Sequence, residues 1–224
     1  MHLLIEMLNA KIEGKHLLKH PFYVAWSRGE LTFDDLRVYA RQYFAQVRAF
    51  PLYLSEMHSR SESLAYRKII ARNLAEEEGG ATTHPELWLD FAAGLGVDCQ
   101  SVMNTTPGPK VAALVETFRS AARMETGLAA VALYCYEKQV PAVAAAKVAG
   151  LQERYEVTDP ATLRYFTVHE TADVNHAAEW EHLIERANPD ASDAATVAGG
   201  VLDALWLALD EIRGSGKSKK VWVH

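Results

Sequence analysis

The chain has 224 residues, enough for one large helical domain, and 49% of them are hydrophobic, enough to form a buried core. Its formal net charge of −6 argues against nucleic acid as the main partner, since phosphate binding needs a basic surface. Cys99 and Cys135 are too few for a disulfide framework, which fits a reducing cytoplasm, and neither a signal peptide nor a membrane-spanning segment is expected.

Helical patterns dominate the sequence, and no strand-like alternation bounded by hairpin signals is found. In chain order, the predicted helices cover residues 2–13, 20–29, 32–58, 61–80, 83–96, 109–139, 141–155, 160–187 and 191–212. The third is expected to bend at Pro51, and the sixth has a weak point at Gly127. We therefore expect an all-α protein with a single domain over residues 1–212 and a flexible basic tail over residues 213–224.

Three polar residues on the predicted helix 160–187 have the spacing of a metal site. His169, Asp173 and His176 stand at positions i, i+4 and i+7, which fall on one helix face. Two imidazoles and a carboxylate suit iron, manganese or zinc. The alternative is a solvated polar face, but the neighbouring apolar residues Phe166 and Val168 indicate that this part of the helix is buried.

Further candidate ligands lie in two other segments. Glu77 ends one predicted helix and His84 begins the next, so that the break at Gly79-Gly80 would place a carboxylate and an imidazole at two helix ends. The alternative is an acidic run that lies in water. Glu137 stands in an apolar context, where a carboxylate needs a partner such as a metal, the side chain of Lys138 or a tyrosine hydroxyl.

Together these candidates supply three carboxylates and three histidines. Carboxylate-bridged di-iron and di-manganese sites in helical bundles use inward-pointing sets of this kind. Such sites leave open positions at which dioxygen can bind. The joint pattern predicts a dioxygen-activating dimetal site with the ligands Glu77, His84, Glu137, His169, Asp173 and His176.

A family resemblance is carried by the segments HPFYVAW (20–26), FPLYLSEMHSR (50–60), EEEGGATTH (76–84), ALYCYEKQVP (132–141) and HETADVNHAAEW (169–180). They resemble the chlamydial protein associating with death domains and its bacterial relatives, over about residues 10–186. The resemblance implies the seven-helix, haem-oxygenase-like fold of the dimetal oxidases. It also implies two divalent metals (Fe/Fe or Fe/Mn), dioxygen and an external reductant as cosubstrates, and a homodimer.

The same resemblance implies a self-sacrificing activity. Proteins of this type make p-aminobenzoate for folate synthesis and take the aromatic ring from a tyrosine of their own chain, so that each chain turns over once or a few times. That position matches Tyr23, and the implied amino donor matches Lys147. Tyr136 matches another tyrosine beside the site, and Tyr39 is similar. Without the resemblance, Tyr23 reads as a core aromatic residue and Lys147 as a lysine that extends to water or, if buried, has a lowered pKa.

Other functions stay open at this point. A dimetal oxidase acting on an external amino acid or fatty acid would share every ligand but would need neither Tyr23 nor Lys147. A thiaminase-like enzyme would use Cys135 as its nucleophile, and a pyrroloquinoline quinone oxidase would need a basic cavity. A non-enzymatic interaction protein would bind no stoichiometric metal.

Overall fold

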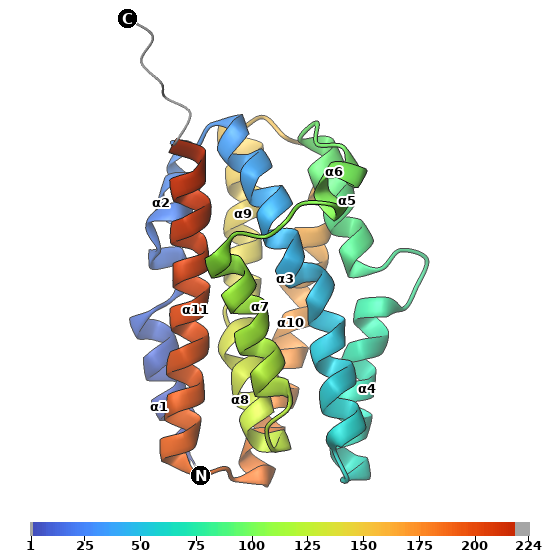
Figure 1. Cartoon of the computed structure of the whole chain (residues 1–224), viewed down its shortest axis with the longest axis vertical. Helices are drawn as coiled ribbons and strands as arrows, with labels where there is room; N and C mark the ends of the chain where they lie inside the picture. The colour runs from blue at the N-terminus through green and yellow to red at the C-terminus, as the bar shows by residue number, and fades with distance from the viewer. Residues whose placement is uncertain (1, 218–224) are drawn as a thin grey trace, which may run out of the picture.

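Long helices run side by side along one axis of the molecule (Figure 1). The computed structural model describes residues 2–217. Its elements are α1 (His2–Gly14), η1 (Leu17–Lys19), α2 (Pro21–Arg28), α3 (Phe33–Arg60), α4 (Leu64–Glu78), α5 (His84–Gly94), α6 (Cys99–Met103), α7 (Pro109–Ala122), α8 (Thr126–Glu137), α9 (Val140–Arg154), α10 (Pro160–Ala187) and α11 (Ala191–Lys217). No strand occurs between residues 2 and 217, so the all-α prediction is confirmed.

Helix starts follow capping signals in the sequence. Thr32 and Asp35 form a reciprocal capping box before α3, and Thr83 and Glu86 form another before α5. Each box satisfies two backbone N–H groups that a helix start leaves unpaired, which fixes where these helices begin. Pro51 lies inside α3 without ending it.

The structure differs from the sequence prediction at several boundaries, and the short elements η1 and α6 were not predicted. Ser61 ends α3, and Ser63 caps α4 instead, because its hydroxyl accepts a backbone hydrogen bond from the first turn. The predicted helix 109–139 is divided into α7 and α8, because Glu125 accepts a backbone N–H and so caps a new start. Gly127 lies within α8, at a point where a Cβ would come within 2.8 Å of a side chain of α10.

Helix α11 is longer than predicted. It continues past residue 212 to Lys217, and the rest of the predicted tail, residues 218–224, lies outside the described residues. By length and hydropathy alone, Ala191–Gly216 could cross a membrane, whereas the sequence pattern had predicted no such helix. In the bundle, 39% of its most apolar window is buried, and the helix packs against α3, α7 and α8. That no segment spans a membrane therefore stays a prediction.

Helix α10 is central to the candidate site. It packs against α5, α8 and α9. Large side chains, among them Phe91, Phe166 and Trp180, are fully buried in this region. Full burial of a phenylalanine stabilises the fold by roughly 1.5–3 kcal/mol. Hydrophobic packing thus fixes the helices that carry the predicted ligands.

Candidate metal centre

The six predicted ligands come together from four helices. Glu77 lies on α4, His84 on α5 and Glu137 on α8, while the other three lie on α10. Each residue is at most 6% exposed to solvent. They form two groups, in each of which the ligand atoms lie within 4.8 Å of one another: a first triad of Glu77, His84 and His169, and a second triad of Glu137, Asp173 and His176.

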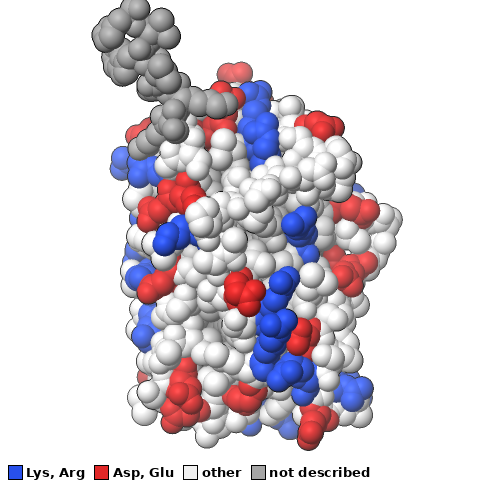
Figure 2. Space-filling model, viewed as in Figure 1, with Lys and Arg blue, Asp and Glu red and all other residues white. Residues whose placement is uncertain are grey.

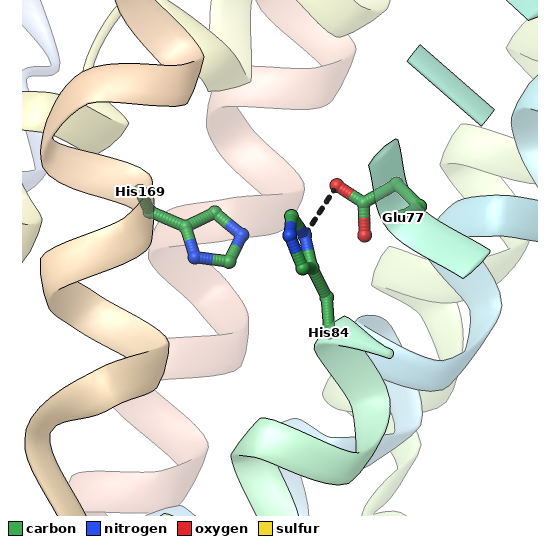
Figure 3. A group of neighbouring side chains, drawn as sticks. All are labelled: Glu77, His84 and His169. Atoms are coloured by element: carbon green, nitrogen blue, oxygen red, sulfur yellow. Dashed lines mark ion pairs between the residues drawn. The ribbon is translucent and has the colours of Figure 1, made fainter. Parts of the chain in front are cut away.

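The first triad joins α4, α5 and α10, and its side chains point toward one another (Figure 3). Oε1 of Glu77 lies 3.0 Å from Nδ1 of His84, and the ring centroids of His84 and His169 are 4.5 Å apart. Nδ1–H of His169 donates to the carbonyl oxygen of Tyr165 at 2.5 Å, which leaves Nε2 for a metal. Burial lowers the pKa of His169 to about 4, so near pH 7 its imidazole has the neutral form that binds metals.

The turn between α4 and α5 brings Glu77 to His84. At Gly79 a Cβ would lie only 2.1 Å from a backbone oxygen of the preceding helical turn. Gly80 has a φ of 82°, in the left-handed region that favours glycine. The predicted helix break at these two glycines is therefore confirmed, and it has a steric cause.

The second triad is formed by α8 and α10. Nδ1 of His176 lies 3.2 Å from Oδ1 of Asp173 and 3.6 Å from Oε2 of Glu137. Two residues that the sequence pattern did not single out contact the ligands of this triad. Nε1–H of Trp180 donates to Oε2 of Glu137 at 2.7 Å, and Oε2 of Glu76 lies 2.8 Å from Nε2 of His176. Hydrogen-bonding partners of this kind commonly orient metal ligands.

The electrostatics of these side chains fit two divalent cations. Burial and the nearby charge of Asp173 raise the pKa of Glu137 well above its usual range. Burial disfavours the imidazolium of His176, but the hydrogen bond to Asp173 and the charge of Glu137 outweigh it and raise that pKa to about 10. In the absence of metal, protons on Glu137 and His176 thus offset the negative charge of the cluster, which bound cations would otherwise neutralise. Among the described residues, Oε1 of Glu137 and Oδ2 of Asp173 are buried without a hydrogen-bond partner, as ligand atoms of a metal would be.

Three of the four predicted catalytic residues line a cavity beside the first triad. This Tyr23 cavity has a volume of about 20 Å³, and its walls include Tyr23, Tyr136, Lys147 and His169. A metal cavity of similar volume is lined by residues of both triads, and it shares Tyr136, His169 and Tyr165 with the Tyr23 cavity. The cavity that holds the predicted substrate tyrosine and the cavity that holds the predicted ligands are therefore adjacent and separated by these three side chains.

Lys147 is enclosed by aromatic rings and is only 5% exposed, so the interpretation that it extends to water is wrong. Its Nζ donates to the hydroxyl of Tyr39 at 2.6 Å and lies 5.4 Å from the ring centroid of Tyr23 and 4.9 Å from that of Phe166. The ring faces favour an ammonium group. Burial favours the neutral amine and lowers the pKa of Lys147 to about 7. Both forms are therefore present near neutral pH.

Two tyrosines that the sequence pattern did not single out also border these cavities. The hydroxyls of Tyr43 and Tyr136 are 3.4 Å apart, and Tyr165 lines both cavities. Burial raises the pKa of Tyr43 to about 12 and that of Tyr165 well above its usual value, so both remain protonated phenols. A signal existed in the spacing: Tyr43 follows Tyr39, and Tyr165 precedes His169, by one helical turn.

The structure does not favour the thiaminase-like and quinone-oxidase alternatives. Cys135 is fully buried outside both cavities, and burial raises the pKa of its thiol to about 12, which disfavours the nucleophilic thiolate. Around the two cavities, Lys147 is the one lysine or arginine among the described lining residues. Neither cavity therefore has the basic lining that a polycarboxylate needs.

Comparisons with known proteins establish the family. The profile of a family described as iron-containing redox enzymes matches residues 37–209. The chain belongs to this family. A 4-aminobenzoate synthase of Chlamydia muridarum is 43% identical to it over 92% of this chain and 88% of the relative. A second 4-aminobenzoate synthase, from Nitrosomonas europaea, is 40% identical over 92% of this chain and 89% of the relative.

Solved structures establish the fold of this member of the family. A TenA homologue from Pseudomonas syringae has a TM-score of 0.81 at 16% identity, covering 95% of this chain and 92% of that one. The haem-oxygenase-like fold and the predicted family resemblance are therefore confirmed. The family's description as iron-containing agrees with two buried triads of imidazoles and carboxylates.

Replacing Lys147 with methionine should stabilise the metal-free protein. Folding lowers the pKa of this lysine from 10.5 to about 7, so the folded state disfavours the ammonium. That cost is absent above pH 10.5, grows as the pH falls, and reaches roughly 5 kcal/mol below pH 7. Allowing for the lost hydrogen bond to Tyr39, we expect Lys147→Met to raise the free energy of unfolding by about 2–4 kcal/mol at pH 6. Urea denaturation should show a smaller gain at pH 9, and an equal gain at both pH values would contradict this explanation.

Proposed function

We propose that this chain makes 4-aminobenzoate, taking the aromatic ring from its own Tyr23 and the amino nitrogen from Lys147. The six ligands of the two triads would hold an iron–iron or iron–manganese pair. The observation that carries the proposal is the enclosure of the Tyr23 ring and the Lys147 amine in one small cavity beside the first triad. The 4-aminobenzoate synthases at 40–43% identity support the product.

The size of the cavities argues against an external organic substrate. A volume of about 20 Å³ holds roughly one water molecule, whereas small-molecule pockets typically measure about 300–1,000 Å³. The aromatic ring beside the predicted ligands is already that of Tyr23. A dimetal oxidase acting on an external amino acid or fatty acid would need space that these walls do not leave.

The tyrosine side chain contains the carbon skeleton of the product. Its ring and Cβ together match the ring and carboxyl carbon of 4-aminobenzoate. The bond between Cα and Cβ of Tyr23 must therefore break, and Cβ must be oxidised to the carboxyl carbon. The nitrogen of Lys147 must exchange its bond to Cε for a bond to the ring carbon that loses the phenol oxygen. The metal pair, when bound, would activate dioxygen as the oxidant for these changes.

The surrounding side chains hold the reacting groups and control their protons. Tyr39 accepts a hydrogen bond from Nζ of Lys147, which fixes the position of the amine. Burial raises the pKa of Tyr23, against a hydrogen bond with Tyr39, so Tyr23 stays a protonated phenol. With its lowered pKa, Lys147 releases its proton near neutral pH and presents a lone pair. The aromatic walls exclude bulk water from this site.

The rate of product formation should rise with pH around a midpoint near 7. Only the neutral amine of Lys147 is a nucleophile, and its pKa is lowered to about 7 by burial. Initial rates of a single turnover, measured from about pH 5.5 to 8.5 on protein already loaded with metal, should follow this titration. Metal content measured at each pH is the control. A flat profile at constant metal content would show that the Lys147 proton does not limit the reaction.

Isotope transfer tests the proposal directly. Protein made in cells fed ¹³C-ring-labelled tyrosine and ¹⁵N-labelled lysine is purified and supplied with iron and manganese, a reductant and dioxygen in unlabelled buffer. We expect 4-aminobenzoate carrying both labels. Product without the ring label would refute Tyr23 as the carbon source, and product with ring carbon but unlabelled nitrogen would refute Lys147 as the donor.

Several expectations rest on the resemblance and the sequence. These are the external reductant, the homodimer, the cytoplasmic location, and the absence of nucleic-acid and membrane partners. They stay predictions. Sedimentation of the purified protein should show a homodimer, and a monomer across the micromolar range would contradict that expectation.

A further inference from the structure

A tight contact joins the helix that carries Tyr23 to the helix that carries Lys147. Trp26 lies one turn after Tyr23 on α2, and Gly150 lies one turn after Lys147 on α9, so each pair shares a helix face. Trp26 is fully buried. A Cβ on Gly150 would lie 2.6 Å from Cδ1 and 2.7 Å from Nε1 of Trp26. The two helices approach this closely only because residue 150 is glycine.

Two hydrogen bonds fix Trp26 at this contact. Its Nε1–H donates to the carbonyl oxygen of Lys147 at 3.3 Å. Its own carbonyl oxygen accepts from the hydroxyl of Tyr155, directly after α9, at 3.3 Å. The indole therefore bonds to the backbone of the residue whose amine faces Tyr23. These two hydrogen bonds fix the position of α2 along the axis of α9.

Helix α2 needs such support because it is short. It has 8 residues, fewer than the roughly 12–15 at which an isolated helix becomes marginally stable in water. His20 caps its start, with Nδ1 accepting the N–H of Phe22 at 3.0 Å, and Gly29 ends it with a φ of 69°. These caps fix where the helix begins and ends. They do not fix its distance from α9.

We propose that the contact between Trp26 and Gly150 positions the Tyr23 ring relative to the Lys147 amine, and this inference rests on the proposed function. Neither Trp26 nor Gly150 is among the described residues that line the two cavities, so both act through the residues one turn away. The Nζ of Lys147 lies 5.4 Å from the ring centroid of Tyr23, and reaction requires a closer approach with correct alignment. A misplacement of about 1 Å can slow such a reaction by about 100-fold.

Gly150→Ala should disturb this geometry without removing a reacting group. The new methyl carbon would meet the indole at 2.6 Å, whereas ordinary contacts begin at 3.4 Å, so the ring of Trp26 must move by nearly 1 Å. We expect the rate of 4-aminobenzoate formation to fall by about 10- to 100-fold at unchanged metal content. Trp26→Phe removes the indole N–H and should lower the rate severalfold.

The double variant separates positioning from a general loss of structure. A phenylalanine ring leaves room for the added methyl group, so Trp26→Phe introduced into Gly150→Ala should restore part of the rate. Gly199→Ala is the matched control, because it lies on α11 and a Cβ there meets nothing within 4 Å. In the metal-free protein, the NMR signal of the ¹⁵N-labelled Lys147 amine should shift in Gly150→Ala and not in the control.

Each outcome of these measurements either supports or overturns the inference. A Gly150→Ala protein that is folded and reacts at the wild-type rate overturns the inference. So does a Gly150→Ala protein that loses metal, or a double variant that recovers nothing. If Gly150→Ala does not fold, Trp26→Phe alone decides: a severalfold lower rate with metal retained supports the inference, and a wild-type rate overturns it. A wild-type protein that forms no product from Tyr23 contradicts the proposed function instead.

Discussion

Tyr23→Phe should abolish 4-aminobenzoate formation while both metals stay bound. Phenylalanine keeps the ring and Cβ but lacks the oxygen that the amine must replace. The fold should survive, because the ring still fills the same buried space and the loss of one hydrogen bond costs only about 0.5–1.5 kcal/mol. Product measured by chromatography after supplying metal, reductant and dioxygen should fall to the level of a metal-free sample.

Tyr134→Phe is the matched control for this prediction. Tyr134 is also fully buried, but its hydroxyl bonds to Asn9 and Glu181 and it lines neither cavity. The Tyr134→Phe variant should therefore form as much 4-aminobenzoate as the unaltered chain does. If Tyr23→Phe keeps that yield, Tyr23 is not the substrate and the dimetal oxidase acting on an external molecule becomes the better account.

His169→Ala should reduce metal binding from about two ions per chain to about one or fewer, because a buried neutral imidazole of the first triad is lost. Product formation should disappear with it, since His169 lines both the Tyr23 cavity and the metal cavity. Elemental analysis after loading with iron and manganese, followed by removal of free ions, gives the stoichiometry.

The control for metal binding lies on the same helix. His182 is exposed on α10 and belongs to neither triad, so His182→Ala should bind metal as the unaltered chain does. Equal metal content in His169→Ala and His182→Ala would show that the first triad is not a metal site. Loss in both would point to damage of the helix rather than to a missing ligand.

Local patterns predicted the features that depend on neighbours along the chain. The spacing of His169, Asp173 and His176 indicated one helix face, and the two glycines after α4 indicated a break. Both features are seen because helix periodicity and glycine's freedom at positive φ are properties of short segments. The start of α4 was predicted at Ser61 but lies at Ser63, because two serines two residues apart are equally good helix caps in the sequence.

Features that depend on packing between distant segments could not be predicted in this way. Nothing near Gly150 in the sequence shows that an indole from α2 rests on it, since the contact forms only when two helices meet. The same holds for the indole N–H of Trp180 on Glu137 and for the burial that lowers the pKa of Lys147. Those positions became interpretable only from the resemblance or from the coordinates.

Mass spectrometry of the peptide that contains residue 23 tests the central claim most directly. Protein is taken through one round with metal, reductant and dioxygen, digested, and compared with an untreated sample, while the 4-aminobenzoate released is counted against the chains present. We predict that one peptide loses its tyrosine ring and Cβ for each molecule of product. Product exceeding the number of chains, with the peptide around Tyr23 intact, would contradict the account.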